Sequence, residues 1–93
     1  MVIKVNAIIT VVGKDMVGIL ANVSKICAEN NINIEEVTQS ILRNMFAMIM
    51  LVDLEKCGCE LTKLDSQLQE LGEKMGVEIH ITRQELFDAM HRI

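Results

Sequence analysis

Hydrophobic and polar positions alternate with a period of two along the start of the chain. Across residues 2–12 every odd position is apolar, whereas the even positions mix polar and apolar side chains. This alternation, with its many β-branched residues, predicts a strand with one fully buried face. Gly13 is expected to end the strand in a turn with positive φ, and Asp15 to cap the helix that follows.

The period then changes to that of a helix. Between residues 16 and 29 the apolar positions fall three or four apart, which predicts an amphipathic helix; they are Met16, Leu20, Val23 and Cys27. Asn30 and Asn31 are expected to end this helix, because asparagine tolerates left-handed backbone angles.

Two further strands are predicted next in the chain. In residues 32–42 the apolar positions change phase around Glu35 and Glu36, and such a one-residue shift indicates a β-bulge. Asn44 suits the tight turn that follows. Residues 46–54 are almost wholly apolar, which is typical of a central strand buried on both faces.

The second half of the chain repeats the helix-then-strand order. Leucines and a methionine step three and four residues apart from Leu61 to Met75, a strong helical signal, and Gly76 is placed to end the helix. Residues 77–82 alternate again and predict a strand. Apolar residues at helical spacing then mark a short tail, namely Leu86, Phe87, Met90 and Ile93.

The element order βαββαβ predicts the fold class. Right-handed crossovers in both βαβ units place two helices on one face of a four-stranded antiparallel sheet, with the first and third strands in its centre. We therefore expect an α+β, ferredoxin-like sandwich that forms one domain over residues 1–93. Its core covers about residues 2–83, and residues 84–93 form a short C-terminal helical tail.

The face of the sheet away from the helices carries more apolar residues than a solvated face should. Residues 46–52 are apolar on both faces, and Ile8 and Val12 add to the second face. An uncovered patch of this size would be an association site. Either the tail or a second copy of the chain is expected to cover it, and we predict a homodimer or a larger homo-oligomer.

Composition removes several classes of function. The 9 basic and 13 acidic residues give a net charge of −4, which disfavours binding to a nucleic-acid backbone. Phe46 and Phe87 are the two aromatic residues, too few for base stacking. No apolar run reaches the roughly 20 residues that span a bilayer, and no secretory signal is recognisable. Three cysteines without a framework spacing suggest reduced thiols and a cytoplasmic protein.

Catalysis and metal binding have little support in the sequence. Cys27 falls on the apolar stripe of the first helix and is expected in the core, while His80 is expected at a solvated or interfacial position. Cys57-Gly58-Cys59 offers two thiols where a closed zinc site needs four ligands. We expect no enzyme activity, no metal and no cofactor, although a redox or metal role of the two loop thiols stays open.

The loop from Gly13 to Ile19 joins a predicted central strand to a helix N-terminus. Backbone N–H groups and the helix dipole favour an anion there, such as a ligand carboxylate. Gly18 weakens a helix, which a close approach of a ligand or of the backbone would explain. Simpler interpretations stay open: Gly13 as a turn residue, Gly18 as a packing contact and Asp15 as an N-cap.

The motif Gly13-Lys14-Asp15-x-x-Gly18-Ile19-Leu20, followed by Asn33-Ile34, resembles the ACT domain, a βαββαβ regulatory module that often binds amino acids. The segments at residues 48–53 and 87–93 resemble those of small stand-alone bacterial and archaeal ACT proteins related to the regulators of the glycine cleavage system. This resemblance covers essentially the whole chain.

The resemblance implies a dimer with ligand pockets at the subunit interface. Carried onto this chain, it implies a binding set formed by Gly13, Lys14, Asp15, Gly18, Ile19 and Asn33. The Gly18 and Ile19 amides would meet a carboxylate, Asp15 or Asn33 would meet an ammonium group, and Lys14 would meet a carboxylate or stay in solvent. The expected function is non-catalytic sensing of an amino acid or similar metabolite, read by an unidentified protein partner. The alternative is a ligand-free protein-interaction or oligomerisation module.

Overall fold

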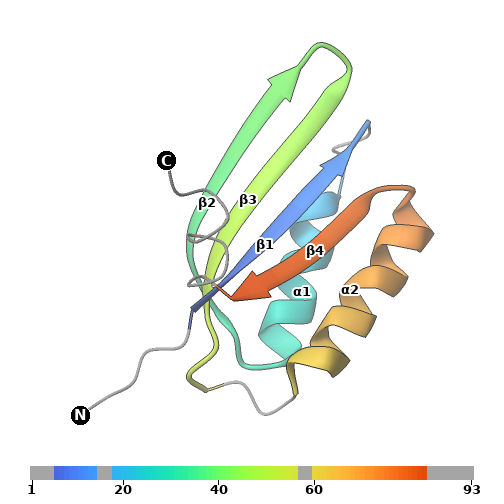
Figure 1. Cartoon of the computed structure of the whole chain (residues 1–93). Coiled ribbons are helices and arrows are strands. Elements are labelled where there is room, and N and C mark those ends of the chain that lie inside the picture. The colour runs from blue at the N-terminus through green and yellow to red at the C-terminus, as the bar shows by residue number, and fades with distance from the viewer. Residues whose placement is uncertain (1–5, 15–17, 57–59, 84–93) are drawn as a thin grey trace.

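A computed structural model describes residues 6–14, 18–56 and 60–83 of the chain. The elements follow the predicted order (Figure 1), and their bounds are β1 Asn6–Gly13, α1 Ile19–Glu29, β2 Asn33–Leu42, β3 Met45–Asp53, α2 Leu61–Met75 and β4 Glu78–Arg83. The predicted tail, residues 84–93, and the loop thiols of Cys57 and Cys59 lie outside the described residues.

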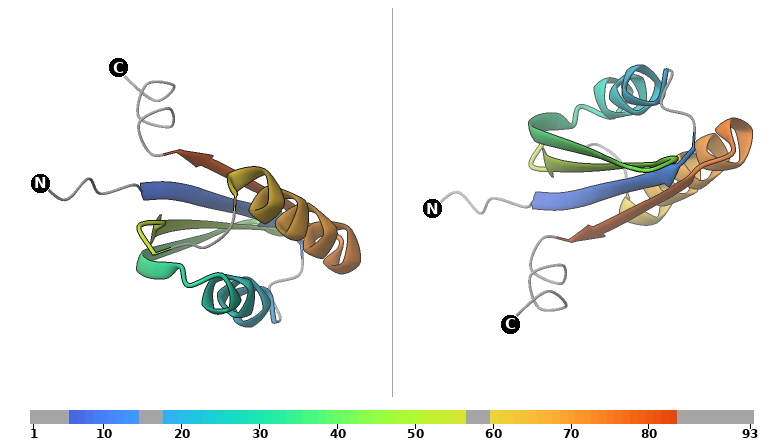
Figure 2. Two further views of the ribbon diagram at one scale, coloured as in Figure 1. Left: turned by 90° about the horizontal axis from the view of Figure 1, so that it is seen from below. Right: turned by 90° about the horizontal axis from the view of Figure 1, so that it is seen from above.

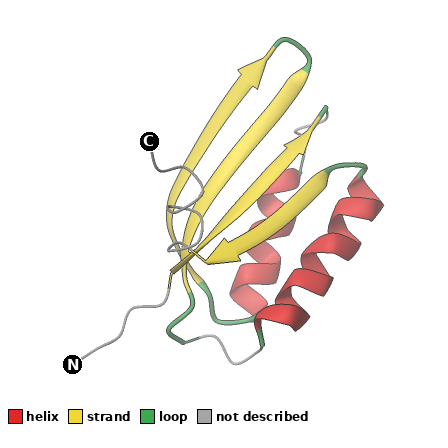
Figure 3. Cartoon of the chain, viewed as in Figure 1, coloured by secondary structure: helices red, strands yellow, loops and turns green. Residues whose placement is uncertain are grey.

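The four strands form one antiparallel sheet in the order β2-β3-β1-β4. Both helices lie on the same side of this sheet (Figures 2 and 3). The ferredoxin-like architecture is therefore confirmed, with β1 and β3 in the centre. This arrangement makes β2 one edge of the sheet and β4 the other edge, against which α2 packs.

The core lies between the sheet and the helices and is almost entirely aliphatic. The inward residues of β1 and β3 are fully or nearly fully buried there, as are the apolar stripes of both helices; they include Ala7, Ile9, Val11, Met48, Met50, Val52, Val23, Leu64 and Leu68. Cys27 is 1% exposed within the same cluster. The prediction that this thiol belongs to the core is confirmed.

The start of α1 differs from the prediction. The helix begins at Ile19 rather than near residue 16, and its N-cap is Gly18, so the prediction of Asp15 as N-cap is wrong. Positive φ occurs at Gly18 (φ 76°) and not at Gly13, which is the last residue of β1. The expected turn at Gly13 is also wrong, because the left-handed residue that redirects the chain comes five positions later.

Close packing leaves no room for a side chain at Gly13 or Gly72. A Cβ added at Gly13 would overlap the side chain of Val77, and one added at Gly72 would lie 2.7 Å from the Val77 carbonyl oxygen. Both glycines are buried. They let α2, the start of β4 and the end of β1 approach one another closely, and the Val77 amide donates a 2.9 Å hydrogen bond to the Gly72 carbonyl.

Other predicted boundaries hold. The pairing of β2 with β3 shifts register between Ile34 and Glu36, which confirms the bulge. Asn31 has a φ of 58° after the end of α1, and Gly76 caps the end of α2 with a φ of 73°.

The strand β3 departs from the prediction that it is buried on both faces. On the sheet face away from the helices, Ile49 is 41% exposed within one subunit.

Candidate functional site

The N-terminus of α1 begins at an exposed glycine, Gly18. Among the described residues no side-chain hydrogen bond caps the helix, and its first turn contains no acidic residue. The Asn22 side chain instead donates a 2.7 Å hydrogen bond to the Gly18 carbonyl oxygen. The first backbone N–H groups of a helix have no partner within the helix, so this end presents donors and the positive end of the helix dipole.

Four of the predicted binding residues meet at this end of the sheet. Gly13 ends β1 and Lys14 follows it, while Gly18 is the N-cap of α1 and Ile19 its first residue (Figure 1). Lys14 is exposed, whereas the Ile19 side chain is completely buried in the core. This 0% exposure counts the backbone as well, so Ile19 offers no accessible group to a ligand within one subunit. Asp15 lies outside the described residues.

Asn33 lies at the opposite end of the sheet. It pairs with Asp53, which also pairs with Asn6 at the beginning of β1, whereas Gly13 pairs with Phe46 at the other end. Seven residues along a strand correspond to about 24 Å. Within one subunit, Asn33 is therefore not brought together with Gly13 and Gly18.

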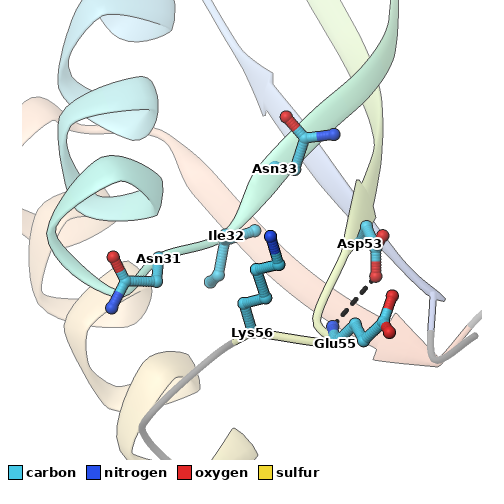
Figure 4. A pocket seen from close by; sticks show the side chains of 6 residues that line it. All are labelled: Asn31, Ile32, Asn33, Asp53, Glu55 and Lys56. Atoms are coloured by element: carbon cyan, nitrogen blue, oxygen red, sulfur yellow. Dashed lines mark hydrogen bonds between the residues drawn. The ribbon is translucent and has the colours of Figure 1, made fainter.

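Asn33 instead lines a hollow of about 770 Å³ where β2 begins and β3 ends. The other lining residues are Asn31, Ile32, Asp53, Glu55 and Lys56. In Figure 4 the Lys56 side chain extends into this hollow between Ile32 and Asp53. Asp53 is held in place because its Oδ1 atom accepts a 2.9 Å hydrogen bond from the Glu55 amide.

The hollow presents both signs of charge. Lys56 can meet a carboxylate, and Asp53 and Glu55 can meet an ammonium group. Among the described residues, no ion pair joins Lys56 to either carboxylate, so these groups stay available to a small polar molecule.

Sequence reasoning missed Asp53 and Lys56. Antiparallel pairing outward from the β2–β3 turn brings the start of β2 to the end of β3. If residues are counted outward from the turn without a bulge, Asn33 pairs with Leu54. The bulge at Glu35 moves the pairing by one residue, onto Asp53. The predicted bulge and the predicted turn, taken together, would have identified Asp53 as the partner of Asn33.

Metal-binding constellations are absent from the part of the chain that the structure describes. It has no group of three or more His, Cys, Asp and Glu residues placed to hold a metal ion. His80 is exposed on the sheet face away from the helices, opposite Thr10. No helix within the described ranges is long and apolar enough to cross a membrane.

Comparison with known proteins identifies the family. The model of the ACT domain matches residues 6–82. The chain belongs to the ACT domain family. A relative from Methanopyrus kandleri, named UPF0237 protein, is 44% identical to this ACT domain over 88 residues, which cover 95% of the chain and 98% of the relative.

Solved structures agree with this assignment. An ACT domain protein from Streptococcus pneumoniae superimposes with a TM-score of 0.79 and 36% identity, covering 90% of this chain and 94% of that one. A putative glycine cleavage system transcriptional repressor superimposes with a TM-score of 0.71 over 89% of this chain and 47% of its own; at 22% identity it shows the shared fold alone. The predicted resemblance to ACT proteins is therefore confirmed. The ACT family is a family of regulatory, ligand-binding modules.

Proposed function

We propose that this ACT domain is a non-catalytic sensor that binds an amino acid or a similar small metabolite between two subunits. The carrying observation is the N-terminus of α1 at the exposed Gly18, where no described side chain caps the helix and where the helix dipole favours a carboxylate. Membership of a ligand-binding regulatory family supports the same conclusion. The cytoplasmic location predicted from the cysteines belongs to this proposal.

Two subunits are needed to assemble the complete binding set. Gly18 and Asn33 lie at opposite ends of one sheet, but a twofold axis perpendicular to the sheet reverses the second subunit. Pairing β2 with its copy in antiparallel fashion would bring the partner subunit's Asn33 toward the Ile41 end of the first subunit. The site would then combine the open helix end of one subunit with the charged hollow of the other.

The outer edge of β2 is suited to form such a subunit interface, here called the seam. Among the described strands only β3 pairs with β2, and an edge strand offers unpaired backbone groups to another chain. Val37 and Ile41 lie on the helix side of β2, opposite Met50 and Phe46, yet Ile41 is 60% exposed. A second subunit would cover these apolar side chains and explain their exposure in one copy. The outer edge of β2 is therefore the proposed seam of the homodimer.

The test is a thermal-shift screen against the twenty amino acids and common small carboxylates. A ligand at 100 times its dissociation constant stabilises the folded state by about 2.7 kcal/mol. For a domain of this size that raises the melting temperature by roughly 11–22 °C. A flat panel with folded protein would contradict the sensor.

Two variants locate the site once a ligand is found. Lys56→Ala removes an exposed cation from the hollow and should raise the dissociation constant while leaving the fold intact. Gly18→Ala should weaken binding more than its effect on stability explains. Gly76→Ala is the matched control, because Gly76 has nearly the same φ (73° against 76°) but lies at the far end of α2. Equal ligand responses in both glycine variants would move the site away from Gly18.

A ligand-free interaction module is the second candidate. The observation that favours it is the exposure of Val12, Met45 and Ile49 on the sheet face away from the helices. Under this function the amino-acid panel stays flat. Replacing Ile49 by lysine would then abolish capture of the protein partner without unfolding the domain.

A further inference from the structure

The two edge strands of the sheet are covered to different extents. In β4 the helix-side residue Ile79 is 1% exposed, because α2 packs along this strand (Figure 1). In β2 the helix-side residue Ile41 is 60% exposed, and residues 36–41 are all exposed. An edge strand whose backbone groups are accessible can pair with another chain. The two edges of this sheet should therefore differ in their capacity to do so.

The backbone of α2 lies very close to the backbone of β4. A Cβ added at Gly72 would lie 2.7 Å from the Val77 carbonyl oxygen and 3.6 Å from the Ile79 backbone nitrogen. The glycine thus lets the helix contact the main chain at the start of β4, and not only the side chains above it. This contact brings the neighbouring turn of α2 within reach of the edge.

Gln69, one helical turn before Gly72, uses this proximity. Its Nε2 atom donates a 2.9 Å hydrogen bond to the Ile79 carbonyl oxygen. Gln69 is exposed, whereas the Ile79 and Val11 side chains fill the core where β4 pairs with β1. An exposed side chain can reach this oxygen only from the free side of β4. The Ile79 carbonyl therefore points away from β1, toward the edge.

The hydrogen bond from Gln69 interferes with pairing at this edge. A strand added beside β4 would need the Ile79 carbonyl as an acceptor for one of its N–H groups, but Gln69 occupies that oxygen and the space next to it. Alternate residues of a strand direct their backbone groups to the same side, so the outward positions of β4 are residues 79, 81 and 83. The described strand has 6 residues, against 10 in β2. Blocking one of its outward positions leaves too short a ladder.

We propose that Gln69 closes the β4 edge to strand addition, so that this domain pairs with an extended strand, here that of a second copy, only at the β2 edge. Two open edges would let subunits add without end, because each added subunit would present another open edge. With β4 closed, assembly by strand pairing stops at two subunits. The number two rests on the seam proposed above, whereas the closure of β4 does not.

Gln69→Met tests the closure, because methionine is also unbranched but has no N–H group to donate. Gln67→Met is the matched control: Gln67 lies on the same helix, but its Oε1 atom accepts a 2.9 Å hydrogen bond from Asn30 of α1 and so faces the other helix. In sedimentation velocity at a series of protein concentrations, we expect Gln69→Met to form assemblies larger than those of the parent, and their mass to rise with concentration. The parent and Gln67→Met should share one size.

Hydrogen exchange locates the new contact. In Gln69→Met the Ile81 amide should exchange more slowly at high than at low protein concentration, because its backbone groups face the opened edge. In the parent its rate should not depend on concentration. Ile41→Lys, added to Gln69→Met to break the seam, should reduce the assemblies to pairs joined through β4. Larger assemblies that persist in this double variant would overturn the proposal.

The closure of β4 and the seam at β2 can fail separately. If Gln69→Met has the same mass as the parent and Gln67→Met at every concentration, the closure is wrong. A monomeric parent with a dimeric Gln69→Met would support the closure and refute the seam. Should Gln69→Met not fold, as judged by circular dichroism, Gln69→Asn gives the same comparison, because its amide is one methylene group too short to reach Ile79.

Discussion

Gly13 allows the close packing of β1 on Val77 to be tested directly. The residue belongs to the candidate binding set, but its Cα faces the Val77 side chain so closely that an added Cβ would overlap it. Gly13→Ala is thus expected to destabilise the fold without any ligand. This matters for function, because a loss of ligand binding in that variant would report packing rather than contact with the ligand.

The magnitude follows from the geometry. The added methyl group meets both Cγ1 and Cβ of Val77, and Val77 is itself buried and backed by α2. Insertion of a methyl group into a packed core costs about 1–3 kcal/mol. We expect a loss of about 2 kcal/mol, which lowers the melting temperature of a domain of this size by roughly 8–16 °C.

The assay is urea denaturation followed by circular dichroism, at one fixed protein concentration because assembly shifts apparent stability. The parent, Gly13→Ala, Val77→Ala and the double variant form a double-mutant cycle. Val77→Ala removes the Cγ1 atom and leaves only the Cβ atom, 2.9 Å from the added methyl group. Gly13→Ala should therefore cost about 1 kcal/mol less in the Val77→Ala background, within the range found for residues in contact.

The reasoning is refuted if the two substitutions are additive. It is also refuted if Gly13→Ala stabilises the protein, since glycine-to-alanine changes at unstrained, open positions gain about 0.4–1 kcal/mol. Either result would show that contact with Val77 does not explain why position 13 holds a glycine.

Other positions test the helix cap, the core and the proposed seam. Gly76→Ala should lower stability by about 1 kcal/mol in the same urea assay, because φ is 73° and nothing lies within 4 Å of the added methyl group, so only backbone strain contributes; a cost above about 3 kcal/mol would show a clash instead. Leu68→Ala should lower the free energy of unfolding by about 2–5 kcal/mol, since Leu68 is completely buried. Ile49→Ala should lower it by less than half as much, because Ile49 is 41% exposed. Similar losses in the two variants would mean that Ile49 is covered in solution. Ile41→Lys should change the stability of the folded subunit by less than about 0.5 kcal/mol. It should weaken self-association at least tenfold, as measured by sedimentation velocity at a series of protein concentrations. Unchanged association would place the interface away from β2.

Much of the fold follows from local pattern. The apolar stripe from Leu61 to Met75 and the terminal Gly76 together predict the second helix with the bounds that it has, Leu61–Met75. The phase change in β2 predicts the bulge, because one extra residue in a strand is what moves its apolar positions from one face to the other. The start of α1 does not follow in this way, because Asp15 offers a plausible cap and nothing local indicates that the chain turns at Gly18 instead.

The candidate site, like the fold, could be predicted from the sequence only in part. The sequence by itself determined the βαββαβ order, the buried stripes and the presence of an unusual glycine at the beginning of a helix, because each depends on neighbours within one or two turns of chain. Only the tertiary structure decided that Asn33 and Gly13 lie at opposite ends of the sheet, about 24 Å apart along the strand direction. It also decided that Asp53 and Lys56 share a hollow with Asn33, and that Gly13 lies against Val77. These facts depend on register between strands distant in sequence and on close contact of side chains from different elements, which no local pattern encodes.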